Sequence, residues 1–438
     1  MQKVNKLHLV CKKVLCIGLF TFFSLTTYAS EIESSSISSN PAAVNITPGT
    51  GALQKYFEEK FGIQNNHGIQ FDGAWLGDVN DLFSGGIEDA KRLTSNSLLI
   101  LDMNVDTEKF IGWKGGLFDV EFLQFNGQST NKQAGVIQGY NSLPAGSPLT
   151  RSQLYQLWYR QKLFNDKLVV RVGKVVPTFD FNNVLKPVPL EKLDLLIPAV
   201  SGLLYTPIFV NSSILGAIPG YYNSAYGITI NITPIKEWYL SLGSYDGNLA
   251  NGIQTGLTGP HFNGYYFNVA ETGVTWLSGK DRKPGTLALG GWYQTGRLRL
   301  EASPTVSESG ASGLYVFGSQ RLWYKNPDVD ISGISAFYQF GINDSDVLIM
   351  NKYLGGGLTA FGLVPHRLND SMGIGGALAW LNQNIFDRKT ELMFQAYYQA
   401  EVIKGIYIEP ALSYIPTPGA SAKLNAAWAG TLRAIVLF

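Results

Sequence analysis

Histidines and serine motifs, the usual carriers of catalysis and metal binding, are sparse in this chain. His67, His261 and His366 are widely separated, and none belongs to an HExxH motif or a Cys and His metal spacing. The chain contains no GxSxG motif, and the glycines of 373–376 fall inside an expected strand rather than before a helix. We therefore expect no catalytic residue, no metal and no cofactor. A catalytic pair assembled across strands stays open as an alternative.

Charged and aromatic residues on the polar faces of expected strands, and in one long loop, could instead contact a polar solute. Basic side chains would donate hydrogen bonds, carboxylates would accept them, and an indole would offer a ring face. The candidates are Arg160, Arg171, Lys174, Asp102, Asp119, Glu121, Asp180 and Trp158. Any one of them could instead belong to a charge ladder along a wall or to a salt bridge that holds a loop.

The elements that carry most of these residues are strands in which hydrophobic and polar residues alternate. In 99–106, leucine, methionine and valine occupy every second position and polar residues occupy most of the others. The same period recurs in 118–122 and in 155–160, which places Tyr155 and Tyr159 on the apolar face and Arg160 on the polar face. One face of these strands suits lipid and the other suits water.

Such segments recur almost to the end of the chain, which predicts an all-β fold, a transmembrane antiparallel β-barrel of about 16 strands. An even number is typical of bacterial barrels, and sixteen strands leave a water-filled lumen. Besides the three segments above, we expect strands at 68–76, 167–176, 225–232, 238–246, 265–276, 286–295, 313–323, 331–342, 352–363, 372–382, 391–402, 405–415 and 427–438. Trp238 and Tyr239, at the start of one of them, are expected at the membrane interface.

The first residues predict export from the cytoplasm. Four lysines precede an apolar segment at 14–25, which ends in the small-residue site Thr27-Tyr28-Ala29. This predicts a cleaved signal peptide at 1–29, because its apolar core is shorter than the roughly 20 residues that span a bilayer. Both cysteines, Cys11 and Cys16, lie inside it, so the remaining chain has no disulfide.

Composition narrows the class further. Hydrophobic residues make up 45% and charged residues 15% of the chain, whereas about 25% charge is usual in soluble domains. No segment after residue 29 has 18 consecutive apolar residues, so a helix is not the expected spanning element. Without the four lysines of the leader, acidic residues slightly outnumber basic ones, which argues against a nucleic-acid partner.

Two regions depart from the strand pattern of the expected barrel, 68–438. Residues 30–67 are expected to form a flexible N-terminus and one short amphipathic helix at 51–61, in which Leu53, Tyr56, Phe57 and Phe61 have helical spacing. Residues 177–222 form a long loop rich in proline, asparagine and glycine. A loop of this length can fold into a barrel and narrow it, and the sequence leaves open whether it does so.

The chain ends on an aromatic residue in an alternating strand. Phe438 shares a face with Val436 and Leu432, whereas Arg433 lies on the other face. Outer-membrane barrels commonly end in this way, and their insertion machinery recognises the terminal residue. We therefore expect Phe438 to contact the barrel-assembly machinery.

Several stretches, through their order and spacing, resemble the carbohydrate-selective porin family of the OprB type. The resemblance covers most of 51–438. It rests on 101–109, 115–118, 171–174 leading to 180–181, 219–223 leading to 238–239 and 245–248, 362–367 with Asp370, 391–414 and 416–419.

The resemblance implies sixteen strands, passive diffusion of glucose and related small carbohydrates, and a narrow passage lined by charged and aromatic side chains. It also implies the outer membrane of a Gram-negative bacterium, with outer-membrane lipid and lipopolysaccharide as neighbours and a monomer or homotrimer as the assembly. The near-neutral charge does not fit a strongly basic lumen. A general non-specific porin and a barrel enzyme, such as a lipase or protease, are the alternatives.

Overall fold

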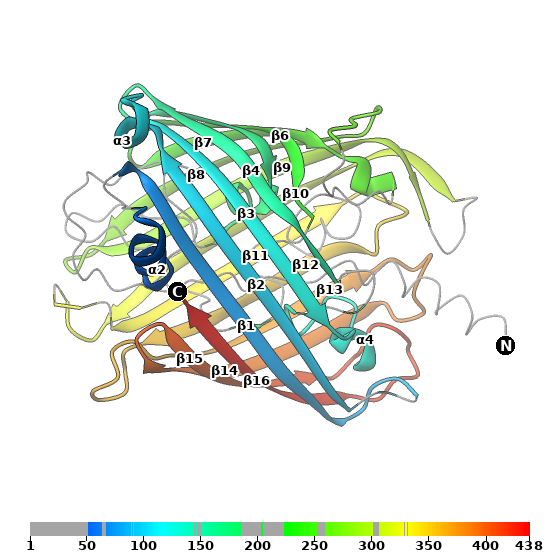
Figure 1. Cartoon of the computed structure of the whole chain (residues 1–438). Coiled ribbons are helices and arrows are strands. Elements are labelled where there is room, and N and C mark those ends of the chain that lie inside the picture. Colours follow the sequence, from blue (N-terminus) through cyan, green and yellow to red (C-terminus); the bar gives the residue numbers. More distant parts are fainter. Residues whose placement is uncertain are drawn as a thin grey trace.

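Sixteen antiparallel strands form one closed barrel in the computed structural model (Figure 1). The structure describes residues 51–63, 67–88, 90, 92–143, 146, 150–184, 203–204, 223–251, 259–300, 306–327, 329–330 and 332–438. Each strand pairs with its neighbours in the chain, and the first pairs with the last. The expected signal peptide, 1–29, and the expected flexible segment up to residue 50 lie outside the described residues.

All sixteen predicted strands are confirmed. Their bounds are β1 (Ile69–Ser84), β2 (Leu93–Asp106), β3 (Gly116–Gly127), β4 (Arg151–Leu163), β5 (Leu168–Val175), β6 (Ala225–Ile235), β7 (Trp238–Asp246), β8 (Tyr266–Ser278), β9 (Lys283–Arg299), β10 (Ser307–Tyr324), β11 (Gly333–Asn343), β12 (Met350–Phe361), β13 (Ser371–Leu381), β14 (Thr390–Ile403), β15 (Ile406–Ile415) and β16 (Ala427–Leu437). Several strands are longer than predicted, because backbone pairing continues where the outward positions become polar, as at Asp81 and Ser95.

The two faces of the strands meet different surroundings. In β2, Asn96, Ile100 and Asp102 are buried inside the barrel, and the positions between them face outward. Large hydrophobic side chains such as Leu289 and Leu432 are more than half exposed on the outer wall. The outer wall therefore suits lipid, whereas the inner wall carries most of the charged and amide side chains of the strands.

The connections are short at one end of the barrel and long at the other. Turns such as 164–167, 236–237 and 404–405 close one end, whereas 128–150 and 176–224 extend from the other. Short turns are periplasmic in bacterial barrels. The predicted helix is confirmed as α2 (Ala52–Phe61) at the short-turn end, where α3 (Thr107–Ile111) joins β2 to β3. Among the described residues, no helix is long and apolar enough to cross a membrane.

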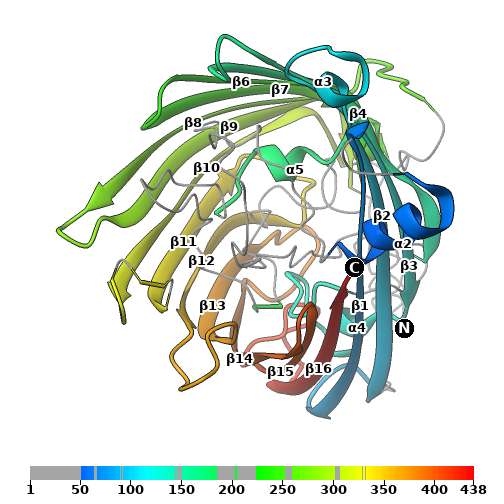
Figure 2. The ribbon, with the colours of Figure 1, turned by 60° about the vertical axis from the view of Figure 1, so that its left-hand side comes forward.

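The long connections begin with short helices. These are α4 (Thr130–Gln133) after β3 and α5 (Pro177–Asp180) after β5, and a 3-10 turn, η5 (Asn248–Asn251), follows β7. Figure 2 shows α5 inside the ring of strands rather than beyond its rim. The connection after β5 therefore begins inside the space that the strands enclose.

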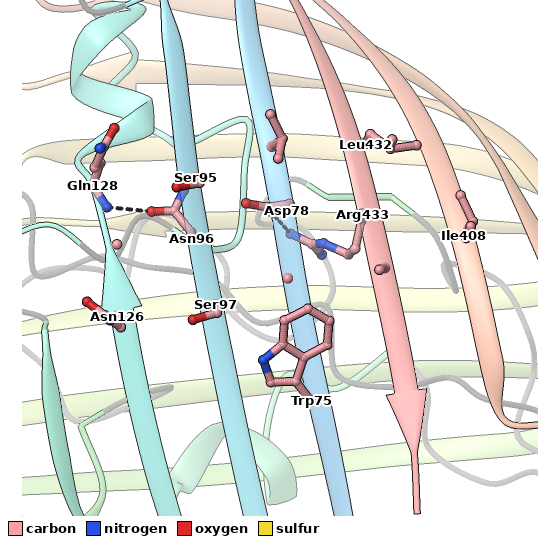
Figure 3. Close-up of a pocket in the computed structure, with 14 residues that line it drawn as sticks. Trp75, Asp78, Ser95, Asn96, Ser97, Asn126, Gln128, Ile408, Leu432 and Arg433 are labelled. Carbon is pink, nitrogen blue, oxygen red and sulfur yellow. Dashed lines mark hydrogen bonds and ion pairs between the residues drawn. The ribbon is translucent and has the colours of Figure 1, made fainter.

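A buried ion pair joins the first and last strands. Asp78 of β1 and Arg433 of β16 are cross-strand partners, and Arg433 Nη2 donates to Asp78 Oδ2 at 2.8 Å (Figure 3). Nearer the end of the chain, Gly73 and Phe438 exchange two backbone hydrogen bonds of 2.9 and 3.0 Å. A side chain at Gly73 would collide with the Phe438 ring, so a glycine is needed for this close approach.

We predict that Arg433→Ala destabilises the barrel by about 3 kcal/mol or more, because it leaves the Asp78 carboxylate buried without its cation. Urea unfolding in detergent measures the effect. Lys283→Ala is the control, since Lys283 pairs with Asp281 at a solvent-accessible rim and should lose less than about 1 kcal/mol. Equal losses in both variants would contradict a structural role for the buried pair.

Candidate functional site

The inner wall of β2 to β5 brings most of the predicted solute contacts together. Cross-strand pairing places Asp102 opposite Glu121, and Asp119 opposite Trp158. Two positions after Trp158 on β4, Arg160 lies opposite Arg171 of β5. All six side chains are buried inside the barrel. Carboxylates therefore lie on β2 and β3, and guanidinium groups lie on β4 and β5. Trp158 is also on β4, directly opposite Asp119 of β3.

The acidic part of this wall has carboxylate oxygens that the described residues do not pair. Asn104 Nδ2 donates to Asp102 Oδ2 at 2.6 Å, and the Gln156 amide donates to Glu121. One oxygen each of Asp102, Asp119 and Glu121 has no hydrogen-bond partner within the described part of the chain. All three carboxyl groups are buried in the inner wall.

The basic part is organised around Arg171. Its guanidinium forms an ion pair with Asp180 of α5 and lies 5.0 Å from the centre of the Trp158 ring. Thr229 Oγ1 also donates to Asp180 Oδ2 at 3.0 Å. Asp180 comes from the long loop, so this ion pair fixes the start of the loop against the wall.

Two placements predicted for β4 and β5 differ in the structure. Lys174 does not join this group: it is fully buried in register with Leu157, and its ammonium donates to the Leu154 carbonyl at 2.7 Å. The prediction that Tyr155 faces lipid is wrong. Tyr155 is fully buried, because β4 has one extra residue there relative to β3 and the alternation shifts.

A first inserted segment, which the sequence analysis missed, enters the lumen from the β3 to β4 connection. Residues 134–143 are all buried, and the Glu391 carboxylate of β14 accepts hydrogen bonds from Ile137 N and Gln138 N, both at 2.8 Å. Asn141 Nδ2 donates to Asp78 Oδ2 at 3.0 Å. Burial raises the pKa of the Tyr140 hydroxyl in this segment, so it stays neutral. The only signal in the sequence was the long gap between two predicted strands.

The second inserted segment is the predicted loop, 177–222, of which 177–184 and 203–204 are described. Glu271 of β8 accepts a hydrogen bond from Asn182 N at 2.6 Å, and Gln339 Nε2 of β11 donates to Asn182 O at 3.3 Å. Leu203 and Leu204 are fully buried. The described parts of the loop therefore lie inside the barrel.

One side chain holds both segments. Gln395 of β14 donates through Nε2 to Tyr140 O at 3.0 Å, and its Oε1 accepts a hydrogen bond from Leu204 N. The two contacts use the two ends of one amide, which can donate and accept at once. Gln395 thus fixes the two segments relative to each other across the lumen.

The wall formed by β7 to β10 carries aromatic side chains. Tyr239 and Tyr315 each donate a hydrogen bond to Glu271 at 2.8 Å. The centre of the Phe267 ring lies 6.2 Å from that of Tyr245 and 6.4 Å from that of Trp292. The interfacial prediction was therefore wrong for Tyr239, which is buried inside. Its neighbour Trp238 is exposed on the outer wall, because consecutive strand residues face opposite sides.

The three histidines considered above are not brought together. His67 precedes β1, His261 lies between β7 and β8, and His366 lies between β12 and β13. Within the described ranges, no group of three His, Cys, Asp or Glu residues is placed to hold a metal ion.

Comparison with known proteins identifies the family. The model of the carbohydrate-selective porin family OprB matches residues 91–438. The chain belongs to this family. Membership and the closed barrel indicate a channel in the outer membrane of a Gram-negative bacterium rather than an enzyme.

Individual members of the OprB family are distant in sequence. Porin B of Pseudomonas aeruginosa is 23% identical over 404 residues, which cover 80% of this chain and 84% of Porin B. The high-pH structure of Pseudomonas putida OprB superposes with a TM-score of 0.72 at 20% identity, covering 92% of this chain and 99% of that one. Its low-pH structure gives 0.54 at 17% identity, with coverages of 89% and 97%. At these identities the structures show a shared fold.

We predict that Gln395→Ala raises single-channel conductance, by about twofold, because the two inserted segments lose their common anchor and the narrow part of the lumen widens. Planar-bilayer recording measures it. Gln399→Ala is the matched control, because Gln399 lies on the same face of β14 and donates to Glu409 on the wall. If both variants conduct like the parent, Gln395 does not hold the constriction.

Proposed function

We propose that the protein is an outer-membrane porin through which small carbohydrates, such as glucose, diffuse passively. The narrow passage runs between the β2 to β5 wall and the two inserted segments. The arrangement that supports this proposal best is Trp158, with carboxylates on one side and Arg160 and Arg171 on the other. Trp158 Nε1 is buried and has no hydrogen-bond partner within the described chain.

The chemistry of this wall suits a sugar. Each sugar hydroxyl donates one hydrogen bond and accepts others, so it can use a carboxylate and a guanidinium at the same time. The less polar face of a sugar ring can pack on the indole of Trp158. Each contact is weak, which transport requires, because a deep binding site would trap the solute.

The balance of charge favours neutral solutes. Asp180 pairs with Arg171, and three carboxyl groups line the adjacent strands. The passage therefore has no excess of cations that would attract anions. A general non-specific porin is the alternative, and it differs in showing no dependence of passage on Trp158.

We also propose how the chain reaches and occupies the membrane. A signal peptide is removed after Ala29, and the barrel-assembly machinery recognises the terminal Phe438. The outer wall contacts lipid and, in the outer leaflet, lipopolysaccharide. The assembly is a monomer or a homotrimer.

Glucose should reduce the ion current through single channels and should swell liposomes that contain the protein. We predict that Trp158→Ala raises the glucose concentration for half-maximal block by about three- to tenfold, as expected for the loss of one weak contact. Trp292→Ala, on the opposite wall, is the control for general loss of an aromatic side chain. A parent protein that shows neither block nor faster swelling with sugars would leave the general porin as the better description.

Ion selectivity should respond in opposite directions to changes on the two sides of Trp158. Asp119→Asn removes negative charge and should shift the reversal potential in a KCl gradient toward anion preference. Arg160→Gln removes positive charge and should shift it toward cations, because local charge sets ion preference in a narrow pore. Shifts of the same sign in both variants would mean that these residues do not line the ion path.

A further inference from the structure

Helix α2 is attached to the edge of β1 where β16 has ended. Both views show it beside β1 and near the C-terminus (Figures 1 and 2). Gln54 Oε1 accepts a hydrogen bond from Phe71 N at 2.9 Å, and Phe71 precedes the residues of β1 that pair with β16. The helix thus supplies an acceptor where the last strand no longer reaches, and this contact fixes its position.

The helix lies on the outer surface of the barrel rather than in the lumen. Phe71 pairs with Met103, which lies on the outward face of β2. The Phe57 ring of α2 stacks on Phe71, with ring centres 4.0 Å apart and planes 9° from parallel. Cross-strand partners share a face of the sheet, so Phe57 packs on the lipid-facing side of β1.

The rest of the apolar arc of α2 is uncovered. Leu53, Tyr56, Phe57 and Phe61 lie on one side of the helix, and none of the residues of α2 is buried. Tyr56 is 51% and Phe61 64% exposed, and both rings contact the Phe57 ring, at 5.8 and 5.5 Å between centres. Phe57 therefore packs against both Tyr56 and Phe61 in a small aromatic cluster at the rim of the barrel. Most of the surface of Tyr56 and Phe61 is exposed.

A second group of exposed apolar side chains lies at the same end of the barrel. Phe110 and Ile111 of α3, and Trp113 just after it, are 55, 69 and 60% exposed. Helix α3 lies close to the start of β1, because Asp106 N donates to Gly68 O at 2.7 Å. Both helices are at the short-turn end, which is the periplasmic end. Aromatic side chains at this level of a barrel lie among lipid headgroups.

We propose that α2 is an interfacial membrane helix whose Tyr56 and Phe61 side chains insert into the phospholipid leaflet on the periplasmic side. The charged residues of α2 balance: it has two lysines and two glutamates, and Lys55 lies 3.8 Å from Glu59. Insertion therefore depends on apolar contact, and anionic lipid adds little.

Single-cysteine labelling of the full chain tests this assignment. Both native cysteines, Cys11 and Cys16, lie in the proposed signal peptide, so the introduced cysteine is the labelling site of the mature chain. An environment-sensitive fluorophore is attached at Tyr56→Cys, at Phe61→Cys or, as a matched control, at Glu59→Cys on the polar side of the same helix. The protein is reconstituted into phosphatidylcholine vesicles with and without nitroxide-labelled lipid. Quenching at 56 and 61 should exceed that at 59 by about twofold or more. It should change little when phosphatidylglycerol is added.

Three outcomes would overturn the proposal. Equal quenching at all three sites would place the helix in water. Quenching at 56 and 61 that appears only with phosphatidylglycerol would show that electrostatic attraction to anionic lipid, rather than apolar insertion, brings the helix to the membrane. Spectral shifts at 56 and 61 that grow with the protein-to-lipid ratio, without nitroxide quenching, would assign the surface to a second copy of this chain. Heat-modifiable migration on gels verifies that each variant keeps a folded barrel.

Discussion

A membrane-crossing sheet must pair its backbone hydrogen-bonding groups, because the hydrocarbon offers no other partner. This requirement explains the closed order of the sixteen strands, in which β1 pairs with β16. Closure depends on close contacts at this junction: the ion pair of Asp78 and Arg433 and the packing of Phe438 over Gly73. Closure also creates two surroundings, lipid outside and an enclosed lumen inside. The alternation of side chains along each strand is the direct consequence.

The same requirement acts on the segments that fold into the lumen. Their backbone groups are buried, so the inner wall must supply partners for them. Glu391 accepts hydrogen bonds from Ile137 and Gln138, Glu271 accepts one from Asn182, and Gln395 holds parts of both segments. Polar residues of the inner wall thus anchor the loops, and a second group of them, on β2 to β5, forms the candidate site.

The candidate site shows how far residue patterns can be taken. Alternation alone placed Asp102, Asp119, Trp158 and Arg160 on the inner face, where the structure has them. It misplaced Tyr155, because one extra residue in β4 shifts the alternation and leaves no mark in the sequence. Consecutive residues in a strand face opposite sides. The same geometry separates Trp238 from Tyr239.

The sequence by itself determined the class of fold, the number of strands and the chemical character of each face. These properties are local, since each depends on residues one or two positions apart. Only the tertiary structure decided which loops enter the lumen and what holds them. The contacts that do so join residues distant in the chain, such as Gln138 with Glu391 and Tyr140 with Gln395. A loop residue and its anchor become neighbours only after the barrel has closed, so no local pattern records the pairing.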